Sequence, residues 1–227
     1  MVLKVNFDRN HLFVDLGNGL WVHDTGCPVS FGNQRIDPRL SGKTRQQLTF
    51  DGKTVDAATI SKFTGVTVAG LIGTDILNKC DQLIDLRTNC MELTLGEQLT
   101  PPAGTTGIGM ELLNGTTPCL WATVGGQTGR YIFDTGAKLS YLVGPKPGDA
   151  TPCTLTDDFW IPIGEFQTQT YHAHVRLNGF ETALRFGTPP LALAEKLRGI
   201  NVQGILGNEL LIGRLSGYFP RIGLLYL

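Results

Sequence analysis

The tripeptide Asp-Thr-Gly occurs twice in this 227-residue chain, each time directly after an apolar, strand-like segment. The first copy is Leu20-Trp-Val-His-Asp24-Thr-Gly-Cys, and the second is Arg130-Tyr-Ile-Phe-Asp134-Thr-Gly-Ala. A glycine-containing turn and another strand-like segment (12–16 and 120–124) precede each copy, which predicts a hairpin followed by a loop in both places. Because an internal repeat indicates one supersecondary unit built twice, the chain is limited to folds with two related halves.

A second pair of segments matches further along the chain. Gly70-Leu-Ile72-Gly73 corresponds to Gly204-Ile-Leu206-Gly207, and each predicts a buried strand, a glycine turn and the start of a short helix. Strand-like segments then close each half, at 83–86 and 91–95 in the first and at 222–227 in the second. A single Asp-Thr-Gly would indicate only a turn, whereas this repeated order indicates two copies of one unit.

The composition is that of an ordinary soluble, strand-rich protein. Hydrophobic residues make up 41% and charged residues 17%, and 29 glycines accompany a scarcity of helical patterns, with one helix expected at 190–197. The formal net charge of -1 gives no reason to expect nucleic acid or an anionic membrane as partner. No apolar run reaches the length of about 18 residues that spans a membrane.

The N-terminal residues and the number of cysteines indicate the cellular compartment, and the spacing of cysteines and histidines indicates whether a metal is bound. The start of the chain lacks the apolar core of a secretory signal, and the five cysteines are odd in number, so we expect free thiols and a cytoplasmic location. No Cys-x-x-Cys pair occurs, and His172 with His174 lacks an apparent third ligand. We therefore expect no metal and no cofactor, and solvent-exposed histidines.

The two repeated motifs resemble those of the pepsin and retropepsin clan of aspartic peptidases. The resemblance implies an all-β, bilobal acid-protease fold, in which two pseudo-two-fold-related, β-barrel-like lobes enclose the active site. Residues 1–100 would form the first lobe, 101–117 a linker and 118–227 the second lobe. Retropepsins assemble their site from two identical chains, but this chain looks like both halves joined, as in bacterial retropepsin-like proteins, so we expect a functional monomer.

The resemblance assigns roles to the repeated residues. Asp24 and Asp134 would be catalytic: two carboxylates about 3 Å apart share one proton, so that one activates a water and the other polarises the peptide carbonyl. The flanking residues Thr25, Gly26, Thr135 and Gly136 would fix the geometry of the pair. The residues Ile72, Gly73, Leu206 and Gly207 would pack behind the two loops.

This reading predicts an endopeptidase that hydrolyses peptides or proteins bound in an extended conformation. The alternative on the same fold is a weakly active or inactive peptide-binding protein, since extended peptides bind such clefts by main-chain hydrogen bonds alone. A further alternative is an all-β domain of unrelated function, although no P-loop and no Gly-x-Ser-x-Gly elbow occurs.

Several features depart from the family pattern. In this clan a hairpin covers the cleft; we expect the larger cover at 159–170, and a short or missing one at 32–42. Trp160, Phe166 and Phe31 are candidate cleft residues, although isolated aromatics are more often core.

Cys27 replaces the usual hydroxyl residue, and a thiol is a weak donor. His23 replaces an apolar residue and is expected to point away from the site. The resemblance also implies that the chain ends, 2–7 and 222–227, pair in a sheet.

Overall fold

The computed structural model describes residues 1–40 and 45–227. The protein is mainly β, with 49% strand and 14% helix, in agreement with the all-β expectation. In the first half of the chain the strands are β1 (Val2–Asp8), β2 (His11–Asp15), β3 (Leu20–His23), β4 (Phe31–Gly32), β5 (Gln47–Phe50), β6 (Lys53–Asp56), β7 (Gly70–Ile72), β8 (Asp81–Asp85) and β9 (Cys90–Thr94). Its helices are the 3-10 turn η1 (Pro38–Leu40), α1 (Ala57–Thr64) and α2 (Thr74–Leu77).

The second half repeats this plan with longer strands. They are β10 (Gly107–Leu113), β11 (Thr117–Val124), β12 (Gln127–Phe133), β13 (Ser140–Leu142), β14 (Thr151–Trp160), β15 (Gly164–Leu177), β16 (Phe180–Gly187), β17 (Gly204–Leu206), β18 (Leu215–Phe219) and β19 (Leu224–Tyr226). The helices are α3 (Leu191–Gly199) and the 3-10 turns η2 (Asn208–Leu211) and η3 (Pro220–Ile222). The predicted helix at 190–197 is therefore present as α3.

The same strand pairings occur in both halves. In the first half, β2 pairs with β3 in antiparallel fashion, and β3 runs parallel to β7 with Val22 opposite Leu71. In the second half, β11 pairs antiparallel with β12, and β12 runs parallel to β17 with Ile132 opposite Ile205. Strands β4 and β13 complete each unit against β7 and β17. Both Asp-Thr-Gly loops therefore leave the sheet at equivalent points, after β3 and β12.

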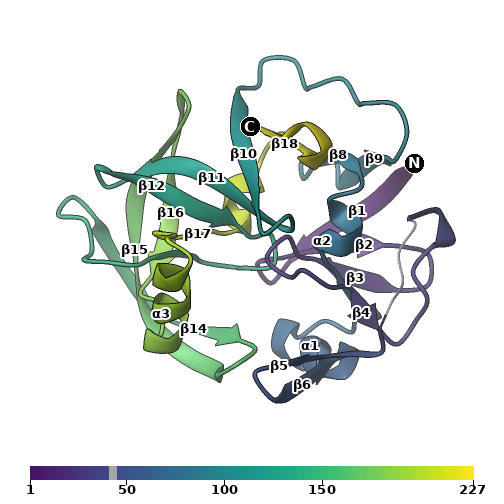
Figure 1. The fold of residues 1–227 in the computed structure, drawn as a ribbon, viewed down its shortest axis with the longest axis horizontal. Coiled ribbons are helices and arrows are strands. Elements are labelled where there is room, and N and C mark those ends of the chain that lie inside the picture. Colours follow the sequence, from purple (N-terminus) through teal and green to yellow (C-terminus); the bar gives the residue numbers. More distant parts are fainter. Residues whose placement is uncertain (41–44) are drawn as a thin grey trace.

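One sheet joins the two halves. Strand β1 pairs with β2 and β9, and β19 pairs with β10 and β18, so the predicted direct pairing of the chain ends is wrong, although both ends belong to this sheet through β9, β8 and β18. The segment expected as a linker, 101–117, contains the whole of β10, which pairs with β19 and places the buried Ile108 opposite Leu225. In addition, β18 pairs with β8, which brings the C-terminal segment into the sheet of the first half (Figure 1).

The apolar core follows from the repeated strands. The main cluster contains residues of both halves, among them Leu12, Trp21, Leu120 and Phe133, each with no exposed side-chain surface. A second cluster lies under β5, β6 and α1, and a third under α3. Full burial of one large apolar side chain contributes roughly 1.5–3 kcal/mol to stability, so the base of each Asp-Thr-Gly loop rests on rigid packing.

Two hairpins project from the repeated units. Strands β5 and β6 form a separate two-stranded sheet, and their turn places Asp51 and Gly52 at positive φ (48° and 76°), as a tight hairpin turn requires. Helix α1 follows directly, capped by the Asp56 side chain, which accepts from the Thr59 N–H, and ended by Gly65 at φ 68°. The longer hairpin, β14–β15, turns at 161–163, within the predicted cover segment 159–170.

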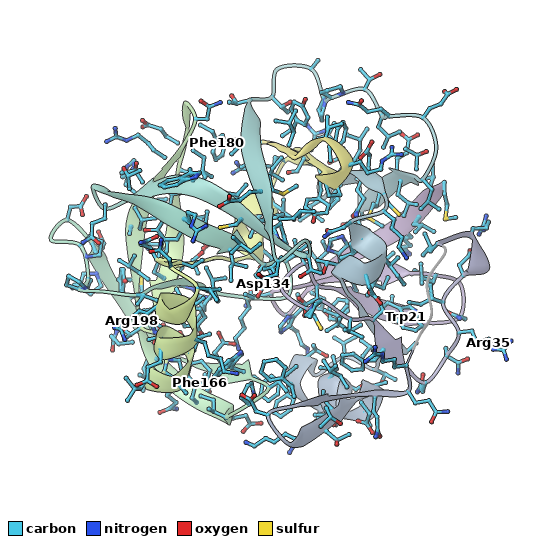
Figure 2. The ribbon with its side chains drawn as sticks, in the orientation of Figure 1. Trp21, Arg35, Asp134, Phe166, Phe180 and Arg198 are labelled. Carbon is cyan, nitrogen blue, oxygen red and sulfur yellow. The ribbon has the colours of Figure 1, made fainter. Side chains whose placement is uncertain are left out.

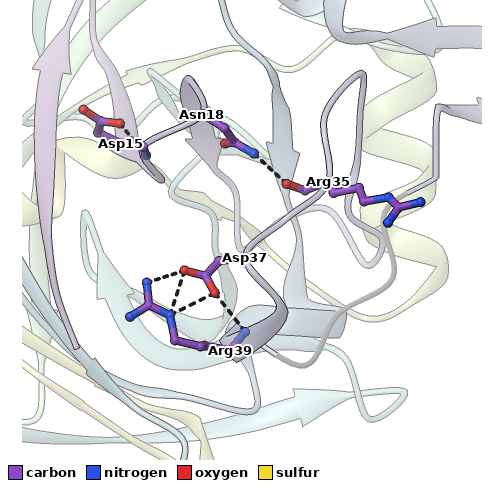
Figure 3. Close-up of polar contacts among 6 residues, drawn as sticks. Asp15, Asn18, Arg35, Asp37 and Arg39 are labelled. Atoms are coloured by element: carbon purple, nitrogen blue, oxygen red, sulfur yellow. Dashed lines mark hydrogen bonds and ion pairs between the residues drawn. The ribbon is translucent and has the colours of Figure 1, made fainter.

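The first hairpin lies later in the chain than predicted. Residues 33–40 fold back against the β2–β3 turn, where the Asn18 Nδ2 donates to the Arg35 carbonyl at 2.6 Å (Figure 3). Ile36 and Leu40 are buried in the main core, which holds this segment away from the cleft. No hairpin forms at 33–40, so the position expected for the first cover, 32–42, is wrong for its described part, whereas the hairpin β5–β6 is indeed shorter than β14–β15; residues 41 and 42 lie outside the described residues.

Candidate active site

The two Asp-Thr-Gly loops interlock through their threonines. The Thr25 N–H donates to the Thr135 hydroxyl oxygen and the Thr135 N–H donates to the Thr25 hydroxyl oxygen, both at 3.0 Å. The Thr25 hydroxyl donates to the Phe133 carbonyl of the opposite half at 2.7 Å, and the single Thr135 hydroxyl proton is shared between the carbonyl and the Nδ1 of His23, at 3.0 and 2.8 Å. Both threonines are fully buried, so these reciprocal bonds hold the loops in one geometry.

The interlock brings the carboxyl groups of Asp24 and Asp134 together, and they hydrogen-bond to each other. Each Oδ1 also accepts from its own loop: Asp24 from the Gly26 and Cys27 N–H groups, both at 2.9 Å, and Asp134 from Gly136 at 2.9 Å and Ala137 at 3.2 Å. Figure 2 shows Asp134 near the centre of the molecule, between the two halves.

Glycine is required beside each carboxyl because the opposite loop is so close. A Cβ placed on Gly26 would lie 2.3 Å from the Asp134 Cγ, and one on Gly136 would lie 2.4 Å from the Asp24 Cγ. These glycines also supply the N–H donors described above. Any side chain at either position would therefore displace the opposite carboxyl or its loop.

The environment favours a protonated carboxyl. Both groups are enclosed by protein, although part of each remains accessible at the base of a cavity. Burial raises the pKa of Asp24 well above its usual value, and the negative charge of Asp134 raises it further. Burial likewise raises the pKa of Asp134, against the lowering effect of the Gly136 N–H. Because the groups interact strongly, the pair binds and releases protons as a unit.

The residues behind the loops are arranged symmetrically. The Asp24 N–H donates to the Ile72 carbonyl at 3.0 Å, and the Asp134 N–H donates to the Leu206 carbonyl at 2.9 Å. Behind them, the N–H groups of Gly73 and Gly207 donate to the hydroxyls of Ser30 and Ser140 at 2.9 and 3.0 Å. A Cβ on either glycine would lie within 2.7 Å of a backbone carbonyl oxygen, that of Cys27 or Ala137.

His23 lies behind the threonine interlock and has no exposed surface. Its Nδ1 lies 2.8 Å from the Thr135 hydroxyl, and its Nε2 lies 2.7 Å from the Gln82 Oε1. The Gln82 amide nitrogen donates to the Leu77 carbonyl, so its oxygen must accept, which places the histidine proton on Nε2. Burial lowers the pKa of His23 to about 4, and the ring is a neutral support that faces away from the cavity.

Neither residue that follows the glycines donates a side-chain hydrogen bond to the pair. The Cys27 thiol donates to the Val29 carbonyl at 3.2 Å, and Ala137 has no donor. Burial raises the pKa of the Cys27 thiol well above its ordinary value, so it is not a reactive thiolate. The carboxyl pair is thus stabilised by backbone donors alone.

A cavity of about 250 Å³ opens above the pair. Its first-half wall is apolar, apart from Thr64, and includes Val22, Cys27, Pro28, Leu48, Phe50, Ile60, Phe63, Thr64 and Leu71. The second-half wall includes Tyr141, Asp158, Trp160, Phe166, Leu193 and Ile205, together with Lys138 and His11. Trp160 and Phe166 therefore lie where the sequence suggested, whereas Phe31 is fully buried in the core beneath the first-half wall.

Side chains of the two halves meet beside the cavity. The rings of Phe63 on α1 and Phe159 on β14 stack with 3.4 Å between centroids and 17° between planes. Lys196 on α3 pairs with Asp51 at the β5–β6 turn at 2.5 Å, and its ammonium lies 4.3 Å from the centre of the Phe50 ring. These contacts join the two halves beside the cavity.

Four residues that line the cavity were not predicted from the sequence: Lys138, Tyr141, Asp158 and His11. Lys138, Tyr141 and Asp158 form a polar cluster, in which the Tyr141 hydroxyl donates to Asp158 and the Lys138 Nζ lies 3.7 Å from its Oδ1. His11 hydrogen-bonds the Gly136 backbone, while its Nδ1 is buried without a partner. Burial and the nearby Lys138 charge lower the pKa of His11 to about 4. A position-by-position comparison of the two repeats would have singled out Lys138 and Tyr141.

Outside the cavity, metal ligands, reactive cysteines and histidines, and membrane-spanning helices would each indicate a further kind of site. Among the described residues, no three His, Cys, Asp or Glu side chains gather where a metal could bind, and all five cysteines are free. His172 and His174 are exposed, and the His172 Nδ1 lies 3.2 Å from the Cys153 Sγ. In the part of the chain that the structure describes, no helix has the length and apolar character needed to cross a membrane.

Comparison with known proteins does not assign the chain to a family: no family model and no curated protein matches it.

Proposed function

We propose that the protein is an aspartic endopeptidase of the bilobal acid-protease type, in which Asp24 and Asp134 activate one water molecule. The observation that carries this proposal is the apposition of two hydrogen-bonded carboxyls, held by reciprocal threonine bonds, at the base of a cavity. A pair used only for support would not need accessible oxygens, and the cost of burying two acidic groups argues for a chemical role.

The chemistry follows from the shared proton. The ionised member of the pair takes a proton from a bound water as the water attacks the peptide carbonyl, and the protonated member donates to the carbonyl oxygen. The proton taken from the water then passes to the leaving nitrogen. As the C–N bond breaks, one hydroxyl proton of the tetrahedral intermediate returns to the carboxylates, which restores the singly protonated pair. The backbone N–H groups of Gly26 and Gly136 keep each Oδ1 in place during these transfers.

The substrate class follows from the cavity and the hairpins that line it. An extended peptide would lie between the Asp24–Asp134 pair and the hairpins β5–β6 and β14–β15, with side chains directed into the two walls. Since both aspartates belong to one chain, a monomer would suffice, and the five free thiols suit a reducing compartment such as the cytoplasm.

Three departures from the family pattern would favour the alternative, a non-catalytic peptide-binding protein: a short first cover, His23 and Cys27. The surroundings of each are compatible with a working carboxyl pair. A first-half hairpin borders the cavity, His23 lies behind the threonines, and the Cys27 thiol donates away from the pair.

Peptide cleavage tests the proposal. A diverse peptide library is incubated with the native protein and with Asp24→Asn and Asp134→Asn, from acidic to neutral pH. The exposed Asp149→Asn is the matched control, because it makes the same change outside the site. We expect cleavage by the native protein and the control and none by either site variant. A folded native protein that cleaves nothing, or a site variant that retains full cleavage, would refute the proposal.

A further inference from the structure

The two walls of the cavity differ in a way that the repeat makes visible. Four positions after Asp24 stands Pro28, whereas four positions after Asp134 stands Lys138. Seven positions after each aspartate stand Phe31 and Tyr141. The second copy has therefore exchanged two apolar residues for polar ones, and both face Asp158 of the hairpin β14–β15.

In the polar cluster of Lys138, Tyr141 and Asp158, the acceptors have hydrogen-bond partners, but the Lys138 donors have none among the described residues. Both oxygens of Asp158 are occupied, Oδ2 by the Tyr141 hydroxyl and Oδ1 by the Phe159 N–H at 2.8 Å. Lys138 has three ammonium donors, but its Nζ lies 3.7 Å from Asp158, beyond the usual length of about 2.7–2.9 Å for a charge-assisted bond. The free hydrogen-bonding capacity of these three residues therefore consists of donors.

The position of Lys138 directs these donors toward the substrate. Its side chain is 22% exposed, and it lines the same cavity as Asp24 and Asp134. The opposite wall carries no charged side chain among its lining residues apart from Asp24 itself. The two subsites that flank the carboxyl pair thus have different chemistry.

We infer that Lys138 is a specificity-determining residue that binds an acceptor oxygen of a substrate side chain, a carboxylate or a carboxamide. The apolar wall of the first half receives a large apolar side chain on the other side of the cleaved bond. This inference depends on the proposed function and adds the substrate class: peptides with an apolar residue on one side of the cleaved bond and Asp, Glu, Asn or Gln on the other.

The test uses peptides that carry Leu, Gln, Glu or Lys at one of the two positions flanking the cleaved bond. At one position only, the native protein should favour Gln or Glu over Leu in kcat/KM by about tenfold, the effect of a hydrogen bond to a charged group. Lys138→Met should abolish this ratio and Lys138→Arg should restore part of it. The exposed Lys146→Met is the control and should behave as the native protein.

The outcomes separate the inference from the proposed function. Equal ratios in the native protein and in Lys138→Met, or a preference for Lys at that position, would overturn the role of Lys138 while peptide cleavage stands. If the native protein cleaves no peptide of the set, the proposed function fails. The role of Lys138 is then decided by the affinities of non-cleavable reduced-bond peptides: the ratio of affinities for Gln or Glu over Leu at that position is compared between the native protein and Lys138→Met. Melting curves identify any variant that has lost its fold.

Discussion

A single methyl group beside the carboxyl pair tests the geometry of the site. In Gly136→Ala the new Cβ would lie 2.4 Å from the Asp24 Cγ and 2.5 Å from its Oδ2, where an ordinary contact is at least 3.4 Å. The Asp24 carboxyl or the loop must therefore move by about 1 Å. A displacement of that size in a catalytic group costs about 100-fold in rate, or about 2.7 kcal/mol. We expect kcat/KM for a cleaved peptide to fall at least that far.

The control for this substitution is Gly148→Ala. Gly148 has no neighbouring atom within 4 Å of the added Cβ, so the same change there should leave kcat/KM and the melting temperature unaltered. Gly26→Ala, whose Cβ would meet the Asp134 carboxyl at 2.3 Å, should behave as Gly136→Ala does. A folded Gly136→Ala protein with activity within a few-fold of the native protein would refute the close apposition of the two loops.

The burial of the site leads to three further expectations. The pH-rate optimum should lie at weaker acidity than in enzymes whose pair receives hydroxyl donors, because burial raises the pKa of Asp24 and Asp134; an optimum confined to strongly acidic pH would count against this. A raised pKa stabilises the fold fully below the unfolded value, about 3.9, and this contribution is lost as pH rises through the folded pKa. Asp24→Asn should therefore raise the melting temperature at pH 7 but not at pH 3, as calorimetry at both values can show. Gln82→Leu should lower the free energy of unfolding in urea by about 1–3 kcal/mol, since it leaves the buried His23 Nε2–H without its acceptor; unchanged stability would contradict the assigned network.

The sequence predicts the parts of this fold that are encoded locally and repeated. The two Asp-Thr-Gly segments, the apolar strands before them and the downstream glycines Gly73 and Gly207 each have a residue pattern that a turn or a buried strand requires. The structure brings these segments together through β3–β7 and β12–β17. The mutual hydrogen bonds of Thr25 and Thr135 agree with the role that the resemblance implied.

Features that depend on contacts distant along the chain were not predictable. His11 contacts Gly136 only because the β1–β2 hairpin reaches the second Asp-Thr-Gly loop, and no periodic pattern in the sequence marks such a contact. Asp158 is one acidic residue in a long polar strand, and its burial depends on Tyr141 and Lys138. The chain ends were misassigned for a similar reason: strand propensity does not specify a partner, and β10 competes for the edge of β19.

The most direct test of the account compares kcat/KM for one cleaved peptide among the native protein, Asp24→Asn, Asp134→Asn and the double variant. Because the two carboxyls act as one unit, each single variant should lose about 10²–10⁴-fold or more, and the double variant should be no worse than either one. A single variant that retains activity, or losses that multiply in the double variant, would contradict a shared site at Asp24 and Asp134.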